Sequence, residues 1–369
     1  MRSARDDGIP HIHLILLGDI FELLKSTKWL EANTRPWEEC TRAHAATVQS
    51  IVQSVFEQNA DFFAALDKLR RDYSIRVSYV PGNHDRPLNG KMGDGCRILL
   101  REKLGQTAGD DRYFEEIFQD PEHRVFARHG HRWDPSNRYL SGSSAVGDFI
   151  VIDVLARLPL VLAQHLRTDV DDKQLYFAHE LDDVIPQTTH EMARWLAEGI
   201  GSLTRLRGPA AMRLALGDIA EELEKRMRGW RVESTLGAWW VRALKGAVPV
   251  LNRVDLVRLT RLLTSPQAPA PPQLSEEAKA DLTGRKRELD YVVFGHTHIP
   301  EYRTIVSRQT HWYLNCGAWR RVHRRADSTS GQATGFVTTN LGALAIIRSP
   351  DEARATKCPR HELRYSLYA

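Results

Sequence analysis

Four hydrophobic stretches of the chain each stop at a glycine or a histidine, and this repeated pattern constrains the fold more than any other feature of the sequence. Their apolar and β-branched residues predict buried strands. Residues at strand ends often build functional sites, so strands of one parallel or mixed sheet would bring the polar residues that follow them to a single edge. The stretches and their following residues are Leu14–Leu17 with Gly18-Asp19, Ser74–Val80 with Pro81-Gly82-Asn83-His84-Asp85, Val125–Arg128 with His129-Gly130-His131, and Tyr291–Phe294 with Gly295-His296-Thr297-His298.

The side chains gathered at this edge favour a metal site. Imidazoles combined with carboxylate and amide oxygens, without thiolates, are typical ligands of Mn²⁺, Fe or Zn²⁺ and differ from a structural zinc cage. Taken alone, Pro81–Asp85 fits equally well an Asn-containing turn that only closes a strand. The other three stretches favour the metal site.

The segment between the first two predicted strands is helical in character. Trp37 to Leu69 carries apolar residues close to three-four spacing, which predicts one or two crossover helices. A helix that joins two parallel strands places the loops after both strands at the same edge of the sheet. We therefore expect Asp19 and Asn83 to lie close together.

The order of the polar blocks carries a resemblance to a known family. The chain presents Gly-Asp-Ile-Phe-Glu, Gly-Asn-His-Asp, His-Gly-His and Gly-His-Thr-His in the order found in the calcineurin-like metallophosphoesterase superfamily. The resemblance covers residues from about 11 to 135 and from about 286 to 345. It implies an α/β fold in which two mixed sheets pack as an α/β/β/α sandwich, here with a helical insertion.

The resemblance also implies the ligands of two divalent metal ions, Mn²⁺, Fe or Zn²⁺. Asp19 would bridge the two ions. Asn83, His129 and His296 would complete the coordination of one ion, and His298 would join Asp19 on the other. The implied reaction is hydrolysis of phosphate monoesters or diesters by attack of a metal-bound hydroxide.

Further residues of the same blocks take catalytic roles by resemblance. His84 would protonate the leaving oxygen or stabilise its developing charge, and Asp85 would orient His84. Glu22 would act from outside the ligand set. His131 also follows the strand of Val125; we expect it to lie behind the ligands or to face solvent, and the family pattern favours His129 over it as the ligand.

One block of the family pattern is missing. Asp-x-His at the end of a first strand is absent, because Gly18-Asp19 belongs to the second block. His13 cannot replace it, since six residues of extended strand place it about 20 Å from Asp19. We therefore expect an N-terminally truncated enzyme whose missing block is encoded upstream of Met1. The alternative is a catalytically impaired scaffold or binding module.

The sequence leaves the substrate open. The Gly18–Glu22 block is similar to that of UDP-2,3-diacylglucosamine hydrolases, which cleave a pyrophosphate, but those enzymes usually carry arginine at the position of His84. A general phosphomonoesterase or phosphodiesterase is the equal alternative. The expected partner is thus a phosphate-ester substrate.

The middle of the chain reads as an insertion into the core. Residues 1–135 form the first part of the predicted core, 136–285 a helical insertion that serves as a cap or an interface, and 286–369 the second part. The helical signals lie at Phe149–Leu158, His190–Ile200 and Val248–Leu263, and a proline-rich linker follows at Ser265–Pro272. A late hairpin over Thr334–Arg348 is expected to turn at Asn340-Leu341-Gly342.

Membrane signals in this insertion are weak. The apolar stretch Phe149–Gln164 is interrupted by Asp153, Arg157 and Pro159, so no transmembrane segment is expected. The helix of Arg253, Arg258 and Arg261 is basic and amphipathic, which allows peripheral membrane contact, although a core-facing stripe with a solvated face explains it as well.

Composition restricts the class of protein but identifies no binding partner. The 369 residues carry a formal net charge of +4, which gives no reason to expect nucleic acid binding. The four cysteines are scattered without a CxxC pair, and the charged N-terminus lacks the apolar core of a signal peptide. We expect a cytoplasmic protein; the oligomeric state stays open.

Overall fold

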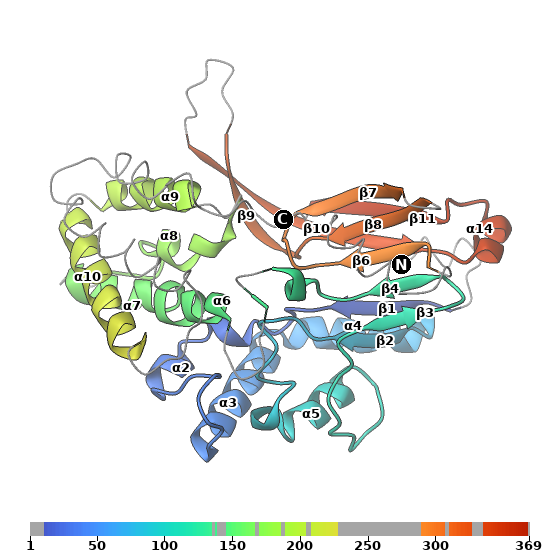
Figure 1. Ribbon diagram of the computed structural model, residues 1–369, viewed down its shortest axis with the longest axis horizontal. Coiled ribbons are helices and arrows are strands. Elements are labelled where there is room, and N and C mark those ends of the chain that lie inside the picture. The colour runs from blue at the N-terminus through green and yellow to red at the C-terminus, as the bar shows by residue number, and fades with distance from the viewer. Residues whose placement is uncertain are drawn as a thin grey trace. The chain divides into compact units, whose positions relative to one another are not determined.

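The computed structural model describes residues 11–134, 137–138, 145–166, 170–185, 189–203, 208–227, 289–306, 310–326 and 335–367. It shows a mixed α/β protein with three β-sheets and helices (Figure 1). The chain forms two compact units. Unit 1 comprises residues 1–138, 273–319 and 342–368, and unit 2 comprises residues 139–272 and 320–341. Residues 320–341, part of the predicted second core segment, thus group with the insertion.

Unit 1 begins with a parallel strand pair. β1 (His13–Leu17) pairs with β2 (Arg76–Val80), with His13 opposite Arg76 and Leu17 opposite Val80. The predicted helical connection is confirmed as two helices, α3 (Arg42–Gln58) and α4 (Ala60–Tyr73). Their buried apolar residues recur every three or four positions, as in an amphipathic helix packed on a core. They are Val48, Ile51 and Val52 on α3, and Phe63 and Leu66 on α4.

The largest sheet of unit 1 has the order β3-β4-β6-β8-β7. The strands β4, β6 and β8 run parallel, and the edge strands β3 and β7 are antiparallel to their neighbours. Both faces of the central strands are buried, which explains their almost uninterrupted apolar sequences. The bounds are β3 Phe118–Asp120, β4 Val125–Ala127, β6 Tyr291–Phe294, β7 Pro300–Val306 and β8 Thr310–Cys316.

The third sheet has the order β11-β10-β9-β5. Its strands are β5 (Val184–Ile185), β9 (Arg320–Arg325), β10 (Phe336–Ile347) and β11 (His361–Leu367). The predicted turn at Asn340-Leu341-Gly342 is wrong, because β10 continues through it. Asn340 and Leu341 pair with Arg321 and Arg320 of β9, so this backbone already has ladder partners.

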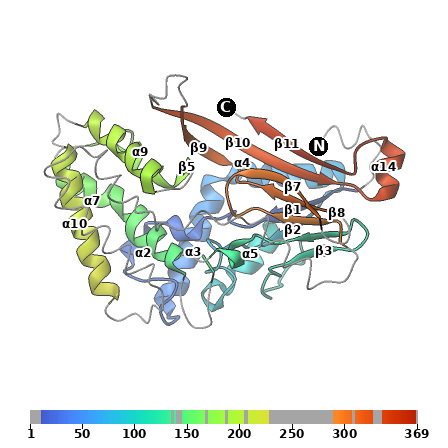
Figure 2. The same ribbon diagram turned by 45° about the horizontal axis from the view of Figure 1, so that its top comes forward.

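The return from β10 to β11 passes through a short helix with a complete N-terminal cap. Figure 2 shows β10 and β11 side by side, with α14 (Pro350–Thr356) at their turn. The backbone N–H of Glu352 donates to Ser349 Oγ at 3.2 Å, and the N–H of Ser349 donates to Glu352 Oε2 at 2.7 Å. This capping box, with proline at the first helical position, fixes where the chain reverses.

Shorter helical pieces line the connections of unit 1. They are the 3₁₀ turn Leu23–Lys25, α2 (Lys28–Glu31), the 3₁₀ turn Lys91–Gly93, α5 (Cys96–Lys103) and the 3₁₀ turn His131–Trp133.

Unit 2 is mainly helical where it is described. The predicted helical signals at Phe149–Leu158 and His190–Ile200 are confirmed, and α7 packs against α10. Val248–Leu263, its three arginines and Ser265–Pro272 lie outside the described residues. The helices are α6 (Val146–Phe149), a π-helical segment (Ile150–Leu155), α7 (Arg157–Leu166), α8 (Tyr176–His179), a 3₁₀ turn (Leu181–Asp183), α9 (Thr189–Ser202) and α10 (Gly208–Met227).

One helical stretch in the described part of the chain, Gly147–Leu166, is long and apolar enough to cross a membrane by length and composition. The stretch includes Asp153, Arg157 and Pro159, the three residues that interrupt the apolar sequence. Half of the stretch is buried within the structure, and the fully buried Asp153 pairs with Arg157 at 3.0 Å. Such burial is typical of a core helix in a folded domain.

We predict that His123 makes the stability of unit 1 depend on pH. Its ring nitrogens lie 2.9 Å from Asp120 Oδ2 and 3.0 Å from Glu352 Oε2. Burial opposes the charged ring, but these two carboxylates outweigh it and raise the pKa of His123. A raised pKa stabilises the fold below the unfolded pKa and loses this effect as the pH rises through the folded pKa.

His123→Gln should therefore lower the free energy of unfolding by about 1 kcal/mol at about pH 5.5, and by clearly less at about pH 8.5. Urea denaturation at both pH values measures the difference. An equal loss at the two pH values would contradict the assignment.

Candidate metal centre

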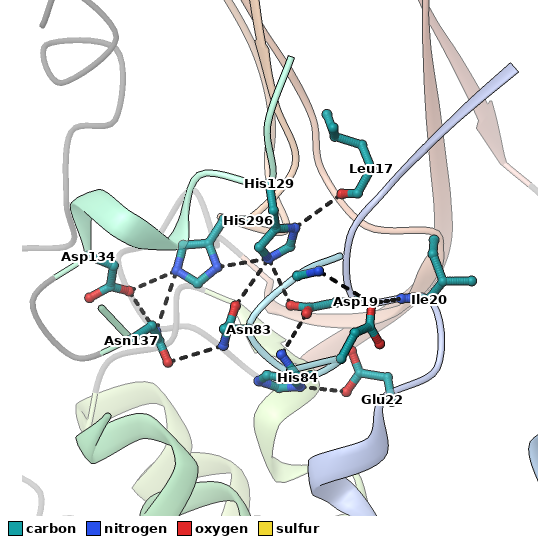
Figure 3. Close-up of polar contacts among 12 residues, drawn as sticks. Leu17, Asp19, Ile20, Glu22, Asn83, His84, His129, Asp134, Asn137 and His296 are labelled. Carbon is teal, nitrogen blue, oxygen red and sulfur yellow. Dashed lines mark hydrogen bonds and ion pairs between the residues drawn. The ribbon is translucent and has the colours of Figure 1, made fainter. Parts of the chain in front are cut away.

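The ends of four strands supply the polar residues of one site in unit 1 (Figure 3). These strands form two parallel pairs, β1 with β2 and β4 with β6, in two different sheets and not in the single sheet that the sequence pattern predicts. Asp19 follows β1, the Asn83-His84-Asp85 loop follows β2, His129 follows β4, and His296 follows β6. Each strand runs parallel to its partner in the ladder, so the carboxyl ends deliver these side chains together. The structure thus brings Asp19 and Asn83 together, as the helical crossover predicts.

Two glycines allow the loops to cross at very short range. A Cβ atom on Gly18, whose φ is +82°, would lie 2.2 Å from His129 Nδ1. A Cβ atom on Gly82 would lie 2.1 Å from Asp19 Oδ1. No other residue type fits at either position without moving a site residue.

Three non-glycine residues of the site adopt the left-handed backbone region. Asp19, Glu22 and His298 have φ values of 49°, 47° and 58°. This conformation is unfavourable for residues with a side chain, and it persists where the surrounding structure enforces it. In the loops after β1 and β6, the packing of the site therefore fixes the directions of these side chains.

Four polar atoms converge at the centre of the site. His129 Nε2 lies 2.9 Å from Asp19 Oδ2, 3.1 Å from Asn83 Oδ1 and 3.2 Å from His296 Nδ1. Asn83 and His129 are 1% and 3% exposed, so little solvent reaches these atoms. Ligand bonds of about 2.1 Å separate neighbouring donors by about 3.0 Å in octahedral and about 3.4 Å in tetrahedral geometry. The observed separations fit that range.

The hydrogen bonds behind these atoms allow all four to present lone pairs to the centre when the ring of His129 is neutral. His129 Nδ1 donates to the carbonyl oxygen of Leu17 at 3.1 Å, which leaves Nε2 unprotonated in the neutral ring. Asn83 Nδ2 donates to Asn137 Oδ1 at 3.3 Å, so its oxygen faces inward. His296 Nε2 lies 2.9 Å from Asp134 Oδ2 and donates to it, leaving Nδ1 as an acceptor.

Asp19 completes the set with its second carboxylate oxygen. Its Oδ1 accepts the backbone N–H of His84 at 2.8 Å, and Oδ2 points to the centre. Two imidazole nitrogens, one amide oxygen and one carboxylate oxygen attract a positive charge between them, which either a proton on His129 Nε2, paired with Asp19 Oδ2, or a metal ion can supply. This donor set could therefore hold a divalent metal ion, and Asp19, His129 and His296 form one of two such candidate groups in the described part of the chain.

Burial and neighbouring charges shift the pKa values of the charged residues at the centre. Burial opposes the charged form of both Asp19 and His129, yet their mutual attraction dominates. It holds the pKa of Asp19 well below its ordinary value and raises the pKa of His129. Burial lowers the pKa of His296, so that ring stays neutral and can act as a ligand.

A second polar group lies beside the first and shares Asp19 with it. Asp19, Glu22 and His84 place one ligand atom each within 4.8 Å of one another. His84 Nδ1 lies 2.9 Å from Glu22 Oε2, and Lys25 Nζ lies 3.2 Å from the same oxygen. Burial opposes protonation of His84, but the charges of Glu22 and Asp19 raise its pKa to about 9.

Asp85 occupies a different position from the one expected beside His84. Its carboxylate accepts the backbone N–H groups of Ile20 at 3.1 Å and Phe21 at 3.0 Å, and burial together with Asp19 raises its pKa to about 6. Glu22, rather than Asp85, contacts the His84 ring. Asp85 instead ties the loop after β2 to the loop after β1.

The remaining histidines surround the centre without joining its four atoms. The ring of His131 lies 5.6 Å from that of His129 and 6.4 Å from that of His296, between centroids. Burial lowers the pKa of His298 to about 4, with Glu22 among its charged neighbours. Neither ring belongs to the candidate metal groups of the described residues.

Asp134 and Asn137 belong to the site although the sequence analysis assigns them no role. Their sequence signal is the turn-forming Asp134-Pro135-Ser136-Asn137 segment, which marks a change of structure and not a site. In the structure, Asn137 Nδ2 donates to Asp134 Oδ2 at 2.7 Å. Both side chains contact ligand residues.

The fold and site together define a mixed α/β protein with a buried His/Asp cluster that could bind a metal. Comparisons of the chain with known protein families, with curated proteins and with solved structures find no match. Its function therefore has to be argued from the site.

We predict that Asn83→Ala and His296→Ala each empty the same metal position. Asn83 Oδ1 and His296 Nδ1 both lie close to His129 Nε2, so loss of either atom removes a ligand of the same ion. The affinity for the metal ion should fall further than the about 10-fold to 100-fold loss caused by removing a residue that only contacts a ligand. Metal content after dialysis and titration calorimetry measure the effect.

His165→Ala is the control, because His165 pairs with Asp218 on the helices of unit 2 and touches no site residue. It should leave the metal content unchanged. A stoichiometry that falls in only one of the two site variants would show that Asn83 and His296 do not share an ion.

Proposed function

We propose that the chain is a metal-dependent phosphoesterase of the calcineurin-like metallophosphoesterase superfamily, with an α/β/β/α sandwich core and a helical insertion. The observation that carries this proposal is the convergence of Asp19, Asn83, His129 and His296 on one point. These residues come from the four sequence blocks that resemble the family. Fold and sequence order thus favour the same chemistry.

In this proposal the four converging residues hold one divalent ion, and Asp19 and His298 contribute to a second. The nitrogen and oxygen donors suit Mn²⁺, Fe or Zn²⁺. The metal, when bound, polarises the phosphate ester and supplies a nucleophile at neutral pH. The protein contributes the fixed directions of its lone pairs and a buried surrounding that strengthens electrostatic interactions.

His84 is the proton donor of the proposed reaction. His84 Nδ1 donates a hydrogen bond to Glu22 Oε2 at 2.9 Å, and the negative charge of Glu22 favours the protonated ring. The proton on Nε2 can then pass to the leaving oxygen. The backbone N–H of His84 donates to Asp19 Oδ1, which fixes the distance between the proton donor and the metal ligand. Asp85 supports both by binding the backbone of Ile20 and Phe21.

A pyrophosphate hydrolase of the UDP-2,3-diacylglucosamine type is the second candidate. The Gly18–Glu22 block favours it, because its Gly-Asp-x-Phe-Glu form is similar to the corresponding block of those hydrolases. His84 itself favours a general phosphomonoesterase or phosphodiesterase, since those pyrophosphate hydrolases usually carry arginine there. A scaffold without catalysis is the remaining outcome of the tests below.

We expect His84→Ala to lower kcat by about 10²-fold to 10⁴-fold while the metal content stays at the wild-type level, because loss of a general acid removes transition-state stabilisation only. Glu22→Gln should lower kcat less, since the ring keeps a hydrogen-bond partner of reduced charge. Steady-state kinetics and metal analysis on the same preparations separate the two effects. Metal loss in proportion to activity would make His84 a ligand instead.

Substrate profiling tests the proposed reaction directly. With Mn²⁺ added, the purified protein should hydrolyse a phosphomonoester or a phosphodiester, and a chelator should abolish this activity because the chemistry depends on the metal. A nucleotide-sugar pyrophosphate in the same panel distinguishes the second candidate. Asp19→Asn should be inactive on every substrate. Metal binding without turnover of any substrate would support the scaffold and overturn the enzyme.

A further inference from the structure

Asp134 and Asn137 follow a hydrogen-bonded turn that begins at Gly130, just after His129. The N–H of Trp133 donates to the carbonyl oxygen of Gly130 at 3.2 Å, and the N–H groups of Asn137 and Arg138 both donate to the carbonyl oxygen of Asp134, at 3.0 and 2.8 Å. Consecutive turns of this kind bring Asp134 and Asn137 to the same side of the segment. They face the candidate metal centre (Figure 3).

The two side chains contact two different ligand residues through a single connected set of hydrogen bonds. Asp134 Oδ2 accepts from His296 Nε2 at 2.9 Å and from Asn137 Nδ2 at 2.7 Å. Asn137 Oδ1 in turn accepts from Asn83 Nδ2 at 3.3 Å. One carboxylate oxygen therefore stands at the end of two branches, one leading to His296 and the other to Asn83.

Each branch removes an ambiguity that the ligand alone would have. A neutral imidazole can carry its proton on either nitrogen, and only the form protonated at Nε2 presents a lone pair from Nδ1 to the centre. A carboxamide can turn over and present its NH₂ group in place of its oxygen. Asp134 selects the proton position of His296, and Asn137 selects the orientation of Asn83.

We propose that Asp134 and Asn137 are positioning residues of the metal centre, which set two of its four donors through one shared carboxylate oxygen. This rests on the proposed metal site. Asp134 fixes Asn137 as well, because an amide whose NH₂ donates to the carboxylate must turn its oxygen towards Asn83. Asp134 therefore orients His296 directly, and it orients Asn83 through Asn137.

The test measures binding of Co²⁺ alone, without substrate, by its visible absorption spectrum and by calorimetry. Asp134→Asn and Asn137→Ala should each weaken Co²⁺ binding by about 10-fold to 100-fold and should change the spectrum, because ligands that are free to turn lose affinity for the ion. In titrations that extend to Co²⁺ concentrations at which Asn83→Ala still binds the ion, adding Asn137→Ala to Asn83→Ala should cost no further affinity, since no amide remains to be oriented. A general loss of packing would instead add to the Asn83→Ala effect.

Asp120→Asn is the matched control. Asp120 also accepts from a histidine, His123, at 2.9 Å, but outside the site. The same chemical change there should leave the affinity for Co²⁺ unchanged. Melting temperatures of the metal-free proteins show whether each variant is folded, and Asn137→Ala keeps the test decisive if Asp134→Asn does not fold.

The possible failures are distinguishable. Wild-type affinity and spectrum in both Asp134→Asn and Asn137→Ala, while the unmodified protein binds Co²⁺, would overturn the positioning role and leave the proposed function standing. An unmodified protein that binds no Co²⁺ would overturn the metal centre, and the positioning role with it.

Discussion

The need for a positive charge among four inward-facing donor atoms is the constraint around which unit 1 is built. Asp19, Asn83 and His296 each place an oxygen or nitrogen atom 2.9 to 3.2 Å from His129 Nε2. Each donor is held there by a hydrogen bond on its far side, so none can turn away from the centre. A proton on His129 pairs with Asp19 in this arrangement, and a metal ion in the place of that proton would find a preorganised ligand set.

The fold supplies the rigidity that this arrangement needs. The strands β4 and β6, which are buried on both faces, fix where the loops of His129 and His296 leave their sheet. Gly18 and Gly82 then allow the loops to approach within distances that no Cβ atom would permit. The left-handed backbone of Asp19 and Glu22 shows that the loop after β1 accepts local strain in return for its side-chain directions.

Much of this could be predicted from the sequence because it depends on local pattern and on simple topology. The apolar runs before Asp19, Asn83, His129 and His296 are confirmed as strands, and the helical spacing after Glu22 predicts the crossover that brings the first two loops together. Adjacency in sequence does not predict the direction of a side chain. Asp85 follows His84 directly, but its carboxylate accepts from the backbone of Ile20 and Phe21. Glu22, which contacts the ring instead, is 62 residues away in sequence. Similarly, Asn340-Leu341-Gly342 has turn composition, but the strand pairing of β10 overrides it.

The turns from Gly130 to Arg138 have a consequence for protein engineering. They end where unit 1 gives way to unit 2 along the chain, and they carry Asp134 and Asn137. A designer who excises the inserted segment, or exchanges it for another, would naturally cut after the 3₁₀ turn His131–Trp133, where regular structure stops. Such a cut would remove two groups that contact the ligands while it left every ligand in place. The safe splice point lies after Arg138, and a graft of the site onto another scaffold has to transplant the turns as well as the strand ends.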